Sequence, residues 1–213
     1  MPRRRKEPEE ALGPAIDGMD QLARLELALR PATVEEDTEE ICEALEPEPE
    51  DPQVILLFGQ GERETKVAGL GRECGFRIEV AARAQLDPDD NLASLADAVH
   101  IIGAGDDLVT ELAIGRNHFI CIFIDDAQEC ENILFQCLHS DAAYIGVWAG
   151  KDLRREVFTQ LSEDGIPDAE LQAICCPMGL GIGGKTPEQD AVAVLAEIMA
   201  ARSGALKRLR LCE

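Results

Sequence analysis

Aromatic residues are scarce in this chain of 213 residues, where phenylalanine, tryptophan and tyrosine together make up 4%. A core must therefore be mainly aliphatic, and the apolar fraction of 46% is large enough to form one. No apolar run approaches the roughly 20 residues that cross a bilayer. The charged residues 1–6 are not followed by the apolar segment of a secretory signal. We therefore expect a cytoplasmic protein that does not enter a membrane.

Basic residues are also few, because 20 lysines and arginines stand against 42 acids, for a formal net charge of −22. Such a surface repels phosphate backbones and anionic lipids, which argues against nucleic acid and membrane surfaces as partners. The chain has eight cysteines. In a cytoplasmic protein most of them are expected to be free thiols.

The N-terminal quarter differs in composition from the rest of the chain. Helical periodicity predicts helices at residues 15–30 and 34–45. Ten acids fall between Glu35 and Asp51, and proline alternates with acid over residues 46–52, which favours an extended linker. We expect a charged helical arm with an acidic, proline-rich linker, a folded domain, and a short tail, at residues 1–52, 53–204 and 205–213.

The most apolar stretch is residues 54–58, which run without interruption into a turn at Gly59 and Gly61. An uninterrupted apolar run of this length predicts a strand that is buried on both faces, as at the centre of a parallel sheet. Backbone N–H groups of the helix that begins after this turn would face whatever binds there.

Strand-like and helical segments alternate after this point. Five strands are predicted, at residues 53–58, 76–81, 99–102, 118–124 and 142–148. Longer helices are predicted at residues 62–74, 127–139, 152–164 and 187–202. This alternation predicts an α/β fold, a doubly wound, Rossmann-like parallel sheet in three layers with strand order 3-2-1-4-5. Ligands would lie over the carboxyl ends of the first and fourth strands.

Gly59 and Gly61 occupy two positions of the dinucleotide-binding fingerprint. The third position, which requires glycine or alanine, is Glu64, whose carboxylate would repel a pyrophosphate. The acid expected after the second strand, to bind a ribose, is replaced by Ala82. NAD(P) binding is therefore disfavoured, and a tight turn from strand to helix is the better interpretation.

A second candidate site lies near the end of the chain. Its candidate residues, two cysteines and a glycine-rich loop, are Cys175, Cys176, Gly179, Gly181, Gly183, Gly184, Lys185 and Thr186. Backbone N–H groups of such a loop, beside a lysine, can form an anion-binding site. A structural loop that leads into the last helix, with threonine as its N-cap, is at least as good an interpretation.

The cysteines and histidines allow both functional and structural interpretations. A thiol near a helix N-terminus has a lowered pKa, so Cys175 or Cys176 could handle sulfur or a soft metal; two small buried residues are the alternative. Cys130 and Cys137 align on an apolar helix stripe and are expected in the core. The three histidines form no recognisable Ser-His-Asp set or Cys-His pair.

Asp125 and Asp126 follow the fourth predicted strand and so fall in the expected ligand crevice. Solvated loop acids are the alternative interpretation. The chain therefore offers one acidic candidate at the carboxyl edge of the sheet and no metal site by ligand spacing.

The C-terminal third contains a series of motifs at residues 143–146 (Ala-Tyr-Ile-Gly), 151–155, 164–167, 176–188 (Cys-Pro-Met-Gly-Leu-Gly-Ile-Gly-Gly-Lys-Thr-Pro-Glu) and 195–198. With these motifs the chain resembles the XdhC/CoxI family of accessory factors for molybdenum hydroxylases. The resemblance covers about residues 53–204, the family's Rossmann-like domain. It implies binding of molybdenum cofactor, support of its sulfuration, and delivery to a hydroxylase.

The chain departs from the family pattern at several polar positions. Glu62 replaces the family's histidine after the first Gly-x-Gly, and Ala82 replaces the acid after the second strand. Phe123-Ile124 stands in place of a Thr-His pair. Near the end of the chain, Cys175 replaces a histidine before the proline, and Gly181 replaces an aspartate in the glycine loop. Asp125 is kept. An acidic arm stands where the family usually has an N-terminal domain, so the chain resembles a divergent member of the family.

The leading hypothesis is a non-catalytic accessory protein for a hydroxylase of the xanthine or carbon monoxide dehydrogenase type, with molybdenum cofactor as the candidate ligand. Candidate partners are a hydroxylase subunit, a cysteine desulfurase and a second copy of the chain. The alternatives are an NAD(P)-dependent oxidoreductase and a structural adaptor that binds no ligand.

Overall fold

The computed structural model describes residues 51–87, 89–103 and 105–206. All of them belong to the second of two units into which the chain divides, Glu46–Glu213. The helices expected at residues 15–30 and 34–45 and most of the expected tail lie outside the described residues. The domain boundaries therefore stay predictions.

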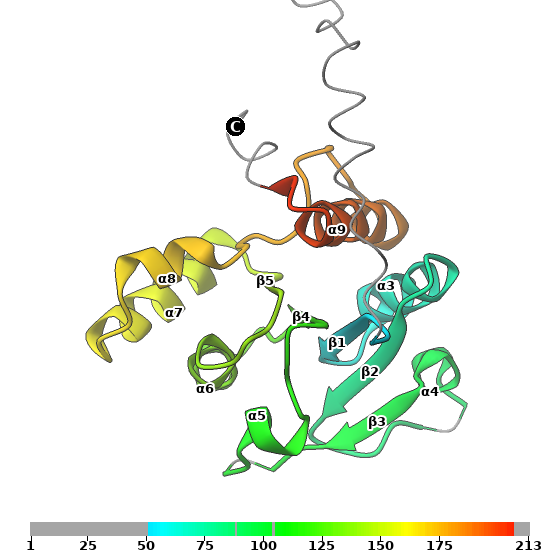
Figure 1. Cartoon of the computed structure of the whole chain (residues 1–213), viewed down its shortest axis with the longest axis horizontal. Coiled ribbons are helices and arrows are strands. Elements are labelled where there is room, and N and C mark those ends of the chain that lie inside the picture. The colour runs from blue at the N-terminus through cyan, green and yellow to red at the C-terminus, as the bar shows by residue number, and fades with distance from the viewer. Residues whose placement is uncertain (1–50, 88, 104, 207–213) are drawn as a thin grey trace, which may run out of the picture. The chain divides into compact units, whose positions relative to one another are not determined.

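The domain is built on a five-stranded parallel sheet with the order β3-β2-β1-β4-β5, which confirms the predicted order (Figure 1). The strands are β1 (Val54–Phe58), β2 (Arg77–Ala82), β3 (Ala98–Ile101), β4 (His118–Ile122) and β5 (Tyr144–Val147). Leu56 of β1 pairs with Glu79 of β2 and with Ile120 of β4, so β1 is hydrogen-bonded on both sides.

The described helices are α3 (Glu62–Glu73), α4 (Asn91–Leu95), α5 (Leu108–Glu111), α6 (Ala127–Leu138), α7 (Lys151–Glu163), α8 (Asp168–Ala173) and α9 (Pro187–Arg202). The four longer helices, α3, α6, α7 and α9, confirm the helices predicted at residues 62–74, 127–139, 152–164 and 187–202, whereas α4 was not predicted. α4 is too short to show a periodic stripe. It begins where the side chain of Asp90 accepts a hydrogen bond from the backbone N–H of Leu92.

The two faces of β1 point into two separate apolar cores. Ile55 and Leu57 pack with residues of α3, α4 and α9, whereas Leu56 and Phe58 pack with residues of α5 to α8. These four side chains are fully buried. Helices therefore cover both faces of the sheet, giving three layers (Figure 1).

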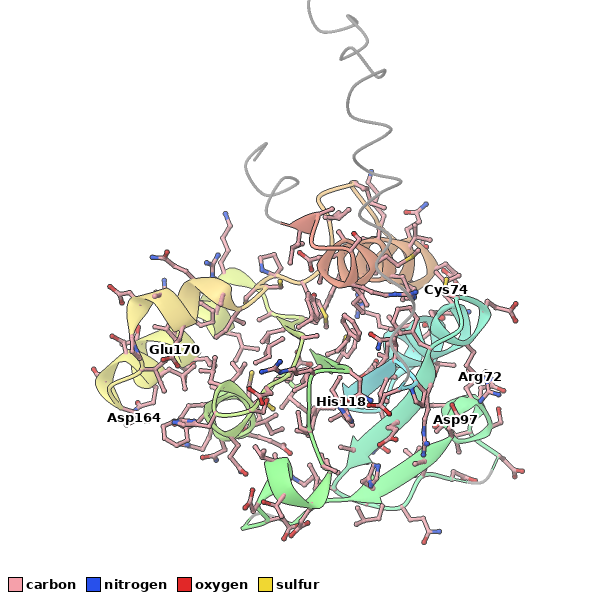
Figure 2. All side chains as sticks on the ribbon, in the orientation of Figure 1. Arg72, Cys74, Asp97, His118, Asp164 and Glu170 are labelled. Atoms are coloured by element: carbon pink, nitrogen blue, oxygen red, sulfur yellow. The ribbon has the colours of Figure 1, made fainter. Side chains whose placement is uncertain are left out.

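Polar contacts at the surface hold the β2–β3 connection in place. The Arg72 guanidinium lies 2.7 Å from the Leu95 carbonyl oxygen and 3.2 Å from a carboxylate oxygen of Asp97 (Figure 2). The other carboxylate oxygen of Asp97 accepts a hydrogen bond from the backbone N–H of Ile78. The end of α4 and the start of β3 are thereby tied to α3 and β2.

The segment after α8 extends the sheet beyond β5. The N–H of Cys175 donates to the Ile145 carbonyl at 2.9 Å, and the N–H of Val147 donates to the Cys175 carbonyl at 2.9 Å. This single parallel bridge between Gly146 and Cys175 was not predicted, because it is too short to give an alternating pattern. It places the two adjacent cysteines beside β5.

A buried carboxylate connects β5, α9 and the chain between them. Glu197 of α9 is 2% exposed, and its Oε2 accepts hydrogen bonds from the Tyr144 hydroxyl at 2.7 Å and from the Gly179 N–H at 2.6 Å. Burial raises the pKa of Tyr144 well above its usual value, so the hydroxyl remains a donor. A methyl group at Gly146 would overlap the Tyr144 ring, so glycine leaves room for this arrangement.

Gly146→Ala should therefore destabilise the domain by about 1–3 kcal/mol, because the added methyl group forces a buried ring to move. Urea unfolding followed by circular dichroism measures this. Gly115→Ala is the control, since its nearest neighbour would be Asn117 at an ordinary 3.7 Å. Equal midpoints for the two variants would contradict the packing described.

Candidate functional site

A cavity of about 510 Å³ lies at the carboxyl ends of the strands, where β1 and β4 lead into their helices. Its lining includes Gly59, Gly61 and Asp125 of the predicted site. The residues that matter for its chemistry are Glu62, Arg63, Glu64, Arg83, Phe123, Asp125, Asp126, Glu129 and Trp148. The cavity therefore occupies the crevice in which the topology predicts a ligand.

The carboxylate of Glu64 fills the space over the turn at residues 59–61. A Cβ atom placed on Gly59 would lie 2.8 Å from Oε1 of Glu64, and one placed on Gly61 would lie 2.9 Å from Oε2. Gly59 has a φ of 126°, a conformation that side chains other than glycine rarely adopt. The two glycines thus leave a space that the protein's own side chain occupies.

Burial controls the electrostatics of Glu64, which is 6% exposed. Removal from water raises the pKa of this carboxyl, and the negative charge of Asp125 raises it further. A hydrogen bond from the Glu64 backbone N–H and the positive charge of Arg63 act in the opposite direction. Glu64 is therefore a buried acid held at the first turn of α3.

Arg63 and two aromatic rings form one wall of the cavity. The rings of Phe123 and Trp148 stack with centroids 6.4 Å apart, and the Arg63 guanidinium lies 5.0 Å from the Trp148 centroid. Nε of Arg63 donates to Asp190 of α9 at 3.0 Å. Since Lys66 also pairs with Glu188 at 2.9 Å, the start of α9 is tied to α3 beside this wall.

Arg83 directly follows β2, next to Ala82, which replaces the expected ribose-binding acid. Its Nε lies 2.6 Å from Oε1 of Glu129 on α6, and its Nη1 donates to the carbonyls of Ile102 and Gly103 at 3.3 and 2.5 Å. The guanidinium is therefore committed to protein partners on two sides. It does not supply a free positive charge for a phosphate.

The cavity is acidic overall, because five carboxyl groups line it against two guanidinium groups, each paired with an acid. Asp126 caps α6 by accepting from the Glu129 N–H at 2.8 Å. Within residues 51–206, where described, no three His, Cys, Asp or Glu side chains are grouped to hold a metal ion. The lining opposes phosphates and offers no ready metal site.

The glycine-rich loop does not line this cavity. None of residues 175–186 is among its lining residues. Gly179 donates to Glu197, the N–H of Lys185 donates to Gln189 Oε1 at 2.9 Å, and Thr186 accepts from the Gln189 N–H as the N-cap of α9. These contacts fit the structural interpretation of the loop. Cofactor binding by Gly181, Gly183, Gly184 and the other predicted loop residues stays a prediction.

The two adjacent cysteines are buried, 1% exposed at Cys175 and 7% at Cys176. Burial raises the pKa of the Cys176 thiol, with only partial opposition from the charge of Arg154. This corrects the lowered pKa expected from a nearby helix N-terminus, because loss of water outweighs it. Cys130 and Cys137 lie in the core as predicted, and burial raises the pKa of each to about 12.

Two of the described histidines, His100 and His118, have structural contacts. His118 (Figure 2) begins β4, and its Nδ1 accepts from the Gly115 N–H at 3.1 Å. Nε2 of His100 lies 2.8 Å from Oε2 of Glu79. Burial lowers the pKa of His118. Neither histidine lines the cavity.

Sequence reasoning missed Arg83, Glu129 and Trp148 as cavity residues. Arg83 and Trp148 directly follow the ends of β2 and β5, so their position relative to the strands could have placed them at the carboxyl edge. Glu129 carried no such signal, because an acid in the first turn of a helix is common for helix stability alone.

These features define a Rossmann-like α/β domain with an acidic, partly self-filled cavity at the carboxyl edge of its sheet. Residues 55–198 match the family described as the XdhC Rossmann domain. This range is well over half of the chain, so the chain belongs to the XdhC family. The resemblance given by its sequence motifs is thereby confirmed.

The chain spans less than half the length of each of two proteins to which it is similar. YqeB of Escherichia coli (strain K12), described as uncharacterized, is 27% identical over 153 residues, covering 71% of this chain and 28% of YqeB. A structure described as a xanthine dehydrogenase (BH1974) from Bacillus halodurans matches with a TM-score of 0.60 at 22% identity, covering 72% of this chain and 43% of that one. The second similarity shows the fold. None of the described helices has the length and apolar character that a bilayer crossing requires.

Alkylation should distinguish buried from exposed thiols. Cys74 at the end of α3 is exposed (Figure 2), whereas Cys175 and Cys176 are buried. We expect iodoacetamide at pH 8 to modify Cys74 at least about tenfold faster than either of them, because the thiolate is the reactive form. Peptide mass spectrometry measures each site. Rapid modification of the adjacent pair in folded protein would contradict their burial.

Glu64→Gln should stabilise the domain at neutral pH and have little effect at acidic pH. The folded protein raises the pKa of Glu64, so it binds this proton more tightly than the unfolded chain. Its contribution to stability is therefore present below the unfolded pKa and lost as pH rises through the folded pKa. Glutamine does not titrate, so the difference between variant and parent should grow from pH 3.5 to 7 in urea unfolding.

Glu62→Gln is the matched control for that series, since it removes a carboxyl group from the exposed side of the same turn. A stability difference for Glu64→Gln that shrinks as pH rises would contradict the sign of the effect.

Proposed function

We propose that this chain is a non-catalytic accessory protein in the cytoplasmic maturation of a molybdenum hydroxylase. The observation that supports this proposal is its membership of the XdhC family, through residues 55–198. The strand order and the motif residues Tyr144, Gly146 and Gly179 take part in the folded core, so the scaffold of the family is retained. The partner is a hydroxylase subunit, and a cysteine desulfurase is a second candidate.

The family also implies molybdenum cofactor, a pterin that carries a phosphate. The cavity residues do not fit that phosphate. Glu64 fills the turn that would hold it, Arg83 is bound to Glu129, and Arg63 is bound to Asp190. The same three features oppose a nicotinamide dinucleotide, so no observation favours the oxidoreductase alternative. The proposed accessory role therefore depends on contacts with partner proteins. It does not require a ligand bound at this turn.

The proposed role does not include sulfur transfer through the adjacent cysteines, Cys175 and Cys176. Their side chains pack against β5 and the two cores, and burial raises the pKa of Cys176. A buried, protonated thiol is a poor acceptor of sulfur from a desulfurase.

Gene deletion in the source organism tests the accessory role. We expect hydroxylase activity in extracts to fall at least about tenfold while the amount of hydroxylase polypeptide on immunoblots stays the same, an expectation based on failed maturation rather than failed synthesis. Complementation with the parent chain, or with Cys176→Ala, should restore activity. Unchanged activity of every molybdenum hydroxylase in the deletion strain would overturn the proposal.

A further inference from the structure

We propose that the Glu64 side chain occupies the position at which a Rossmann-like fold binds a phosphate, and that this side chain prevents phosphate-bearing ligands from binding in the cavity. The inference goes beyond the accessory role and does not depend on it. It concerns a property of the isolated protein, and it assigns that property to one side chain.

The first argument is the position of the carboxylate. Its two oxygens lie against both glycines of the turn, one nearest to Gly59 and the other nearest to Gly61. In Rossmann-like folds, glycines at this turn let the backbone approach a pyrophosphate closely. Here the group that approaches the two glycines closely is the carboxylate of Glu64, which belongs to the same chain.

The second argument is the hydrogen bonding. The Glu64 carboxylate accepts a hydrogen bond from its own backbone N–H in the first turn of α3. N–H groups at this end of a helix are the donors that otherwise bind a phosphate. An anion that is covalently part of the chain has an effective concentration that a free phosphate cannot match.

The third argument is that the other residues of the cavity lining offer no favourable charge to a phosphate. An entering phosphate would have to displace Glu64 while remaining near Glu62 and Asp125, both of which line the cavity. Neither guanidinium is free, since each is in an ion pair of 3.0 Å or less. Exclusion therefore rests on the space that Glu64 occupies and is strengthened by charge.

An acid at the third position of a helix also stabilises the helix terminus, which is a simpler role for Glu64. That role predicts only a loss of stability when Glu64 is shortened. Internal occupancy predicts in addition a gain of phosphate binding, which helix capping alone does not produce. A binding measurement therefore separates the two.

The experiment is calorimetric titration of the purified full-length chain and its variants with ADP and with inorganic pyrophosphate. The parent protein is expected to bind neither. Glu64→Ala is expected to bind both at least about tenfold more tightly, a change of about 1.4 kcal/mol. Glu73→Ala, which removes an exposed carboxyl group from the other end of α3 and outside the cavity, is expected to behave as the parent.

Three further variants make the result specific. Glu64→Gln keeps the side-chain volume, so this variant should still bind neither ligand. Glu64→Gly removes that volume and should bind both ligands as Glu64→Ala does. It takes the place of the alanine variant if that variant does not fold. Gly61→Leu in the Glu64→Ala background should refill the space and abolish the gained binding, which places it at the turn.

Binding of ADP or pyrophosphate by the parent protein would overturn the proposal. So would the absence of any gain in folded Glu64→Ala and Glu64→Gly, or an equal gain in Glu64→Gln. These titrations contain no hydroxylase, so a result that overturns the proposal for Glu64 does not affect the accessory role. Likewise, a deletion strain with unchanged hydroxylase activity does not affect the proposal for Glu64.

Discussion

The contact between the Glu64 carboxylate and the turn at Gly59 and Gly61 decides what this domain can bind. A buried strand leads into a glycine turn, and a helix begins with its N–H groups directed at the space above. In this chain that space is filled from within. The architecture of a phosphate-binding fold is therefore present, while its binding position is closed by an acid buried at the first helical turn.

A second buried carboxylate accounts for motifs in the C-terminal third of the chain. Glu197 joins Tyr144 of β5 to the N–H of Gly179, and Gly146 makes room for the tyrosine ring. Residues that resemble a family signature thus act here as a structural clamp that fixes α9 to the sheet. This contact and the strand order belong to the part of the chain that matches the family, residues 55–198.

The strand order and nearly all element positions could be predicted because residues 54–58 are apolar without interruption and the later segments keep clear periodicities. α4 and the bridge at Cys175 could not, because short elements carry no period. Sequence position also indicated that Glu64 would oppose a pyrophosphate. It could not show that the carboxylate folds back over both glycines, nor that the loop at residues 179–186 lies outside the cavity, since these depend on side-chain and helix packing.

The most direct test of this account is a crystal structure of the unmodified chain grown in the presence of millimolar pyrophosphate. The account predicts a Glu64 carboxylate in contact with Gly59 and Gly61, hydrogen-bonded to its own backbone amide, and no pyrophosphate at the turn. A Glu64 side chain turned out to solvent, with pyrophosphate bound by the N–H groups of α3, would contradict it.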